Sequence, residues 1–461
     1  MKEFWLCLLV LLIFGCKSEK DQYLAVYEEG EEFLTGHLGM DAKRSNTFGL
    51  AVPGMSFKQR AKFAVGNSLF KQAWVSSPAS TTARDGLGPT FNARACASCH
   101  TNDGRGKPLL QTENTSGFLM RISQSGKNEN GGPLGLPNYG SQIHDRSNRG
   151  IPIEARVVVT YDTINGQYSD GKPYSLLQPI YNFEEENFGE IENVMTSPRI
   201  APQTIGMGFI NTLPDSEILK FTDEFDKDED GISGRPNLVW NYETNQEDLG
   251  RFGWKANEPT LKTQIASAFQ GDMGLTNPIF TEQNCPDIQE DCNQAPNGGD
   301  PEVTEKQLER VLFYQASISV PNRRNTKDKE VLEGKVLFER LNCIGCHAIN
   351  QVTKASAINP MLENVKIKPY SDFLLHDMGE ALADNRPDYR ATGREWRTQP
   401  LWGIGLISTV NKHTYFLHDG RARSIEEAIL WHGGEAQKSK EVFRNLPENQ
   451  RKQLLAFINS L

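Results

Sequence analysis

The chain has 461 residues and a formal net charge of −10, with 38% apolar and 23% charged residues. Its 40 glycines and 24 prolines make it rich in loops, yet the composition is neither disordered nor collagen-like. The length allows two or three domains, and the acidic balance argues against a nucleic-acid partner. Eight cysteines are the unusual feature, and their spacing carries most of the functional information.

The N-terminus has the form of a bacterial lipoprotein signal. Lys2 precedes an apolar stretch that ends in Ile13-Phe14-Gly15-Cys16, which resembles a lipobox. The stretch is too short to span a bilayer. We predict a signal peptide at residues 1–15 and a tether at residues 16–45, lipidated on Cys16; the alternative is an uncleaved anchor helix. Either form places the body of the protein in the cell envelope, in the periplasm or associated with the outer membrane.

The first cysteine motif follows a helical pattern. Gly66-Asn-Ser-Leu-Phe70 has the glycine and aromatic residue found before the motif in class I c-type domains, and Cys96-Ala-Ser-Cys99-His100 comes next. The pattern Cys-x-x-Cys-His is typical of covalent haem attachment. Two thiols add across the two vinyl groups of haem, and the following histidine ligates the iron. We therefore predict that Cys96 and Cys99 attach a haem and that His100 is its proximal ligand.

Two further features lie between residues 150 and 240. The β-branched run Ala155–Tyr161 predicts a hairpin that decorates the first domain. The segment from 226 to 232 has the spacing of hard oxygen ligands for Ca²⁺, and Asn237 replaces the glutamate that closes an EF-hand. We predict a dedicated calcium loop, with a solvated acidic turn as the alternative. Its candidate ligands are Asp226, Asp228, Asp230 and the carbonyl of Ile232.

Two further cysteines lie close together in the second half of the chain. Cys285 and Cys292 flank six residues, and an oxidising compartment favours a disulfide between them. The Gly- and Pro-rich stretch 293–301 follows and predicts a domain boundary. We expect an N-terminal haem domain with insertions at residues 46–300 and a C-terminal haem domain at residues 301–461.

The second domain repeats the features of the first. Cys343-Ile-Gly-Cys346-His347 is preceded by Gly334-Lys-Val-Leu-Phe338, so we predict a second haem attached by Cys343 and Cys346 with His347 as its proximal ligand. Thr260 and Ser424 are expected helix N-caps, and each lies eight residues after a phenylalanine. These parallels predict a mainly α fold, a tandem of two class I cytochrome c-like domains with long loops and a small β insertion.

Both haem motifs, together with Arg251-Phe-Gly-Trp254 and Phe416-Leu-His418-Asp-Gly-Arg421, resemble bacterial dihaem cytochrome c peroxidases. More closely, residues 45–461 are similar to the dihaem oxidoreductase, or thiol-oxidoreductase-like, family. The resemblance implies two cytochrome c folds that face each other across a pseudo-twofold interface, with Ca²⁺ between or near the haems. It also implies that a small donor protein, a cytochrome or a cupredoxin, delivers electrons to the second haem.

The sixth iron ligands decide whether a haem binds peroxide or only carries electrons. Related peroxidases place a methionine ligand where Glu395 and Trp396 stand here, so that ligand is missing. For the second haem we expect, in order of preference, Met378, His376 and His432. For the first haem the candidates are Met207 and His144, and the alternative is a sixth position with no side-chain ligand.

The resemblance also suggests residues for the reaction at the first haem. Peroxide cleavage needs a group that moves a proton between the two oxygens. The position of the family's catalytic glutamate is occupied here by Asp272, which is our candidate acid-base residue; the alternative is an ordinary residue at a helix end. Trp254 is a candidate for the electron route between the haems, or else a core tryptophan.

These observations predict an exported, lipid-anchored dihaem c-type oxidoreductase that reduces hydrogen peroxide or a related small oxidant. The alternative is a dihaem electron-transfer cytochrome without catalytic activity, with both irons six-coordinate. Oxidation of thiols, which the family label suggests, lacks a nucleophilic cysteine because every cysteine of the mature chain already has a predicted role.

Overall fold

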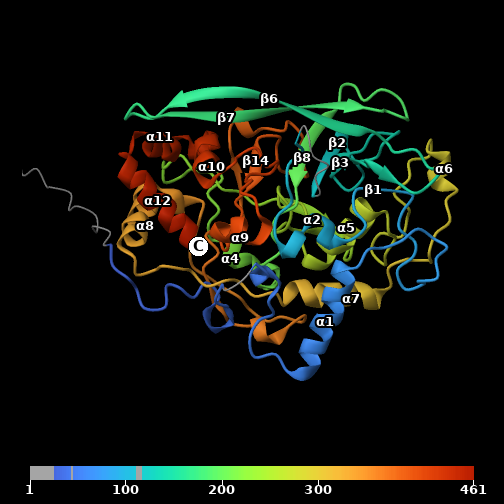
Figure 1. Cartoon of the computed structure of the whole chain (residues 1–461), viewed down its shortest axis with the longest axis horizontal. Helices are drawn as coiled ribbons and strands as arrows, with labels where there is room; N and C mark the ends of the chain where they lie inside the picture. The colour runs from blue at the N-terminus through green and yellow to red at the C-terminus, as the bar shows by residue number, and fades with distance from the viewer. Residues whose placement is uncertain (1–24, 43–44, 111–116) are drawn as a thin grey trace, which may run out of the picture.

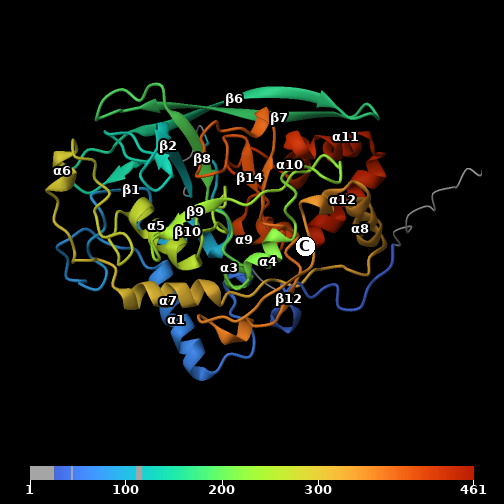
Figure 2. The ribbon, with the colours of Figure 1, turned by 180° about the vertical axis from the view of Figure 1, so that it is seen from behind.

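The computed structural model describes residues 25–42, 45–110 and 117–461, and Figures 1 and 2 show it from opposite sides. The predicted signal peptide and Cys16 lie outside the described residues. In the part of the chain that is described, twelve α-helices alternate with fourteen strands. None of these helices combines the length and the apolar character that a membrane span requires.

The α-helices are α1 (Phe57–Lys71), α2 (Cys96–Cys99), α3 (Met207–Asn211), α4 (Asp215–Leu219), α5 (Leu261–Met273), α6 (Glu290–Asn293), α7 (Glu305–Ala316), α8 (Lys329–Arg340), α9 (Ile407–Asn411), α10 (Ile425–Trp431), α11 (Gln437–Asn445) and α12 (Glu448–Ser460). The strands are β1 (Thr90–Phe91), β2 (Phe118–Lys127), β3 (Pro133–Leu134), β4 (Gln142–Ile143), β5 (Arg146–Ser147), β6 (Arg156–Gln167), β7 (Pro173–Glu184), β8 (Met195–Ile200), β9 (Leu238–Asn241), β10 (Gln246–Leu249), β11 (Gln351–Val352), β12 (Lys366–Ile367), β13 (Leu375–Asp377) and β14 (Glu395–Arg397).

The prediction of a mainly α tandem of two cytochrome c-like domains is wrong. Fourteen strands accompany the twelve α-helices in the described residues and form several small sheets. The long segments that we expected as loops contain short apolar stretches that pair with one another. For example, β2 pairs antiparallel with β8, and β13 pairs with β14. Pairing satisfies the backbone groups of segments that enter the core, so the fold is mixed α and β.

The strands β6 and β7 form the longest hairpin, which runs along the top of the molecule in Figure 1. The β-branched run at residues 155–161 lies at its start. The hairpin does not stay with the N-terminal half as expected. Near its turn, the hydroxyl of Tyr168 donates to Glu426 (2.8 Å), and Asp170 pairs with Arg451 (2.8 Å). It therefore joins the N-terminal half to the C-terminal helices.

Two helix pairs have the same packing and support the two haem motifs. Helix α1 crosses α7, and α8 crosses α12. Each crossing passes over a glycine: Gly66 lies against the carbonyl of Arg310, and Gly334 lies against the carbonyl of Gln453. Helix α7 falls after the predicted domain boundary at residue 300, yet it packs against α1. The boundary itself stays a prediction.

The two halves share one hydrophobic core that extends from Leu34 to Leu461. Matching loops meet at its centre, where the indole of Trp402 packs against Gly206 and the side chain of Ile205 packs against Gly403. The repeated helix pairs and these loops hold the two Cys-x-x-Cys-His motifs around one shared hydrophobic core. This packing positions the site described below.

Replacing Gly66 or Gly334 by alanine should destabilise the protein by about 1–3 kcal/mol. An added Cβ would lie 2.1 Å from the Arg310 carbonyl oxygen at Gly66 and 2.0 Å from the Gln453 carbonyl oxygen at Gly334, so the helices must separate. Thermal unfolding of the two variants measures the effect. Gly271→Ala is the matched control, because its nearest neighbour is 4.0 Å away and alanine favours the helix. Equal melting temperatures in all three variants would contradict the close crossing.

Candidate functional site

The first Cys-x-x-Cys-His motif forms a single helical turn. In α2 the amide of His100 donates to the carbonyl of Cys96 (2.9 Å), which places both cysteines and the histidine on one side of the turn. The Nδ1 atom of His100 donates to the carbonyl of Pro202 (2.7 Å). Burial lowers the pKa of this imidazole, so it is neutral at pH 7. With Nδ1 protonated, the lone pair is on Nε2, which is the state that a metal ligand needs.

The second motif repeats this geometry. The amide of His347 donates to the carbonyl of Cys343 (2.9 Å), and its Nδ1 donates to the carbonyl of Tyr370 (2.9 Å). Burial lowers the pKa of His347 to about 4. The phenylalanine before each motif packs beside the histidine: Phe70 lies 6.2 Å from His100 and Phe338 lies 6.0 Å from His347, between ring centres.

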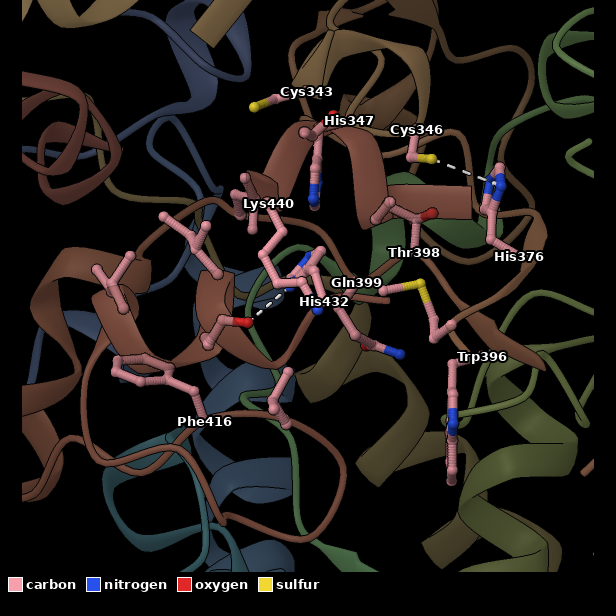
Figure 3. Close-up of a pocket in the computed structure, with 18 of the residues that line it drawn as sticks. Cys343, Cys346, His347, His376, Trp396, Thr398, Gln399, Phe416, His432 and Lys440 are labelled. Atoms are coloured by element: carbon pink, nitrogen blue, oxygen red, sulfur yellow. Dashed lines mark hydrogen bonds between the residues drawn. The ribbon is translucent and has the colours of Figure 1, made fainter. Parts of the chain in front are cut away.

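Each motif opens into a large cavity. The first cavity has a volume of about 190 Å³ and is lined by Cys96, Cys99 and His100 among others. The second cavity has a volume of about 220 Å³ and is lined by Cys343, Cys346 and His347 among others. Figure 3 shows the second cavity, with these three side chains entering it from one segment.

The two cavities are neighbours. Three residues, Trp254, Arg397 and Gln399, line both of them. The indole nitrogen of Trp254 donates to the carbonyl of Ile200 (2.8 Å), which fixes the ring in the shared wall. Burial lowers the pKa of Arg397 to about 9, and its guanidinium donates to backbone carbonyls rather than to a carboxylate. A positive charge and a large aromatic ring therefore separate the two cavities.

The residues present fit haem at both cavities. All four motif cysteines carry free thiols, and both histidines are neutral with Nδ1 already bonded. In the first cavity the buried Nε of Arg121 makes no hydrogen bond to any described residue, and burial lowers the pKa of this guanidinium. Haem carries two carboxylates, which would satisfy such a cation. The donor set and the unpaired arginine therefore match the chemistry of a haem group.

The predicted sixth ligands of the second haem differ in whether their donor atoms are free or already hydrogen-bonded. Met378 and His376 both line the second cavity. However, Nε2 of His376 bonds to Asp372 (2.8 Å) and its Nδ1 bonds to Glu435 (2.6 Å), so both ring nitrogens are occupied. The thioether of Met378, in contrast, makes no hydrogen bond to a described residue.

Met207 lines the first cavity at the start of α3. It follows the segment whose Pro202 carbonyl holds His100. His144 does not line this cavity, since its Nδ1 bonds to Glu154 (3.0 Å) and its Nε2 to the carbonyl of Gly271 (2.8 Å).

Asp272 lines the first cavity at the C-terminal end of α5. One carboxylate oxygen accepts from Nε2 of Gln142 (3.0 Å), and its backbone carbonyl accepts from the amides of Asn92 and Ala93 (2.9 and 3.1 Å). The carboxylate is also close enough to Arg121 to oppose the lowering of its pKa. The structure thus brings to one cavity the predicted acid-base residue, the haem motif and a buried arginine whose Nε makes no hydrogen bond to a described residue.

The predicted calcium loop lies beside the second motif. Asp226 and Asp228 direct carboxylate oxygens toward each other, and the third oxygen comes from Asp223, all within 4.8 Å. Asp230 turns away instead and accepts from Nδ2 of Asn342 (3.1 Å). Ile232 lines the second cavity. Sequence reasoning had not included Asp223, because it precedes the D-x-D-x-D pattern.

The structure also places the two remaining cysteines, and it reveals cavity residues that the sequence analysis did not include. The Sγ atoms of Cys285 and Cys292 are bonded, at 2.04 Å. No role was predicted for Arg121, Arg397 or Gln399, which line the cavities. Arg121 could not have been found, because it is one position in a strand whose inward face depends on the pairing of β2 with β8.

Comparison with protein families gave one match. A model described as "Di-haem oxidoreductase, putative peroxidase" matches residues 35–461. That range includes both cavities and all four motif cysteines. Comparisons with curated proteins and with solved structures gave no match.

Proposed function

Because this chain belongs to the di-haem oxidoreductase family, we propose that it is an enzyme that reduces hydrogen peroxide or a related small peroxide. The family confirms the resemblance drawn from the two Cys-x-x-Cys-His motifs, and it makes the chain an oxidoreductase with two haems. The electrons come from a small donor protein, either a cytochrome or a cupredoxin. The net reaction is H₂O₂ + 2 H⁺ + 2 e⁻ → 2 H₂O.

The observation that carries this proposal is the shared wall between the two cavities. Since Trp254, Arg397 and Gln399 line both, a group in one cavity is separated from a group in the other by single side chains. Two redox groups at such close quarters can supply the two electrons that one peroxide requires. Trp254 is the aromatic side chain on this route.

The chain's own residues have distinct roles in this proposal. Cys96, Cys99, Cys343 and Cys346 would form thioethers with the haem vinyl groups, and His100 and His347 would bind the irons through Nε2. Haem iron supplies one-electron redox chemistry and, where a coordination position is open, a binding site for peroxide. Asp272 takes a proton from one peroxide oxygen and returns it to the other, while Gln142 holds its carboxylate in place.

The remaining expectations belong to the same proposal. We propose that the protein is exported and anchored through a lipidated Cys16, in the periplasm or at the outer membrane. Ca²⁺ would bind at the loop that contains Asp226 and Asp228, where three carboxylates approach one another. A cation there would hold this loop against the second haem motif, because Ile232 contacts Gly345.

Steady-state kinetics tests the proposal. The haem-loaded protein is mixed with a reduced small cytochrome and hydrogen peroxide, and oxidation of the cytochrome is followed by absorbance. The proposal predicts saturable oxidation that requires both peroxide and the protein. If the protein exchanges electrons with the cytochrome but peroxide has no effect, the chain is a dihaem electron carrier and the peroxidase function is wrong.

A further inference from the structure

Helices α5 and α10 begin in the same way, each beside one cavity. The hydroxyl of Thr260 accepts from the amide of Thr263 (3.1 Å), and the hydroxyl of Ser424 accepts from the amide of Glu427 (3.1 Å). Each cap fixes the first turn of its helix, and therefore the direction in which every later side chain points. Positions at equal distances from Thr260 and Ser424 can thus be compared directly.

The two helices line their cavities with the same positions. At one, four, five, eight and twelve residues after the cap, α5 and the segment formed by α10 and the residues that follow it contribute pairs to the cavity walls. Helix α10 ends at Trp431, so His432 is its C-cap residue and Ala436 belongs to the next short helical turn. The pairs are Leu261 and Ile425, Gln264 and Ala428, Ile265 and Ile429, Ala268 and His432, and Asp272 and Ala436. At the eighth position the first cavity thus has a methyl group where the second has an imidazole.

The imidazole of His432 has one nitrogen free for a ligand. Its Nδ1 donates to the carbonyl of Ala428 (2.6 Å), one turn earlier, so the lone pair is on Nε2. Its Nε2 makes no hydrogen bond to any residue in the described ranges. Burial lowers the pKa of His432, so the ring is neutral. This is the same arrangement as in His100 and His347, where a carbonyl holds Nδ1.

His432 also faces the proximal ligand of the second cavity. In Figure 3 the side chain of His347, directly after Cys346, extends toward the ring of His432, which stands at the end of α10. The two imidazoles are near enough that His432, after burial, contributes to the lowered pKa of His347, while the hydrogen bond to the Tyr370 carbonyl opposes that lowering. His418, which also lines this cavity, stacks flat on Trp396 at 3.8 Å instead.

We infer that His432 is the sixth iron ligand of the second haem and that Ala268 leaves the corresponding position of the first haem open. His376 cannot compete, because carboxylates occupy both of its ring nitrogens. The second haem is then closed on both sides by histidine and serves electron transfer. The first haem has no side-chain ligand from α5, and Asp272 lies one helical turn beyond Ala268 on the same face.

Peroxide binding at the open position rests on the proposed function, whereas the ligand assignment does not. An open first haem, with an acid-base residue one turn away, matches what peroxide cleavage requires. At the second haem the residue that corresponds to Asp272 is Ala436, which cannot transfer a proton. The two sites therefore differ at the eighth and the twelfth position after the cap, although α5 and α10 begin in the same way and α10 ends at Trp431 while α5 continues to Met273.

Electron paramagnetic resonance of the oxidised holoprotein tests the assignment. The wild type should show one low-spin and one high-spin haem, and no Met-to-iron absorption band. His432→Ala should convert the low-spin signal to high-spin, and added imidazole should restore it. Ala268→His should convert the high-spin signal to low-spin. Met378→Leu is the control and should leave both signals unchanged.

Two results would overturn the assignment. One is a low-spin signal that persists in His432→Ala, and the other is a low-spin signal lost in Met378→Leu. If His432→Ala does not fold, His432→Met tests the same assignment. This variant should show a Met-to-iron absorption band that the wild type lacks. If these spectra agree but no variant or wild type turns over peroxide, the ligand assignment stands and the peroxidase function fails.

Discussion

The Asp272→Asn variant is expected to bind both haems and to lose about 10²–10⁴-fold in kcat for peroxide reduction. Asparagine has nearly the same size and can still accept the hydrogen bond from Gln142, but it cannot carry a proton from one oxygen to the other. Steady-state oxidation of a reduced small cytochrome measures the loss. KM for peroxide should change little, because the substitution removes a proton-transfer group rather than a binding contact.

Asp162→Asn is the matched control, since Asp162 is exposed on β6, far from both cavities in sequence, and should retain full activity. If Asp272→Asn and Asp162→Asn have the same kcat, Asp272 is an ordinary residue at the end of α5. A rise in KM without a fall in kcat would instead assign it to substrate binding.

Removing one pair of motif cysteines should reduce covalently bound haem from two to one per chain. Cys96→Ala with Cys99→Ala removes the first attachment, and Cys343→Ala with Cys346→Ala removes the second. The reason is that all four thiols are free and line the cavities, so each pair is available for thioether bonds. Haem staining of denatured protein, quantified against total protein, measures the ratio.

The disulfide cysteines provide the control for that experiment. Cys285→Ser with Cys292→Ser removes the bond between them and should leave two covalent haems. Haem that is extracted from the wild type by acidic solvent would show that attachment is not covalent. A cysteine pair whose loss leaves both haems in place would contradict the role of that motif.

Features that depend on a few neighbouring residues could be predicted from the sequence. Thr260 and Ser424 cap α5 and α10 as expected, because a cap requires only the hydroxyl and the next turn of backbone. The Cys-x-x-Cys-His motifs are equally local, and each forms one turn with its histidine bonded back to the first cysteine. Local patterns of this kind can be recognised without knowledge of the tertiary structure.

The fold class could not be predicted in this way. Strand β2 pairs with β8, and their sequences give no indication of the partner. Helix α7 has a clear N-cap at Thr304, yet only the tertiary structure reveals that it packs against α1 across the expected boundary. Each of these pairings joins segments that are distant in the sequence. Neither the hydrophobic periodicity of a segment nor the strand propensity of its residues indicates which segment it pairs with.

The same limit applies to the candidate site. His432 was a weak candidate while the histidines could be ranked only by position in the sequence. Its carbonyl partner, and its register with Ala268, become visible only when both helices are placed beside their cavities. Conversely, His376 has no ring nitrogen free to bind iron, because Asp372 and Glu435 are hydrogen-bonded to both of them. Hydrogen bonds of this kind are not encoded in spacing.

The most direct measurement for the central claim is a single turnover in the absence of oxygen. The dihaem protein is fully reduced, freed of excess reductant and mixed rapidly with one equivalent of hydrogen peroxide, while haem absorbance is followed. The account predicts that both haems are oxidised, so that one peroxide removes two electrons from each chain. Haems that stay reduced in the presence of peroxide would contradict it.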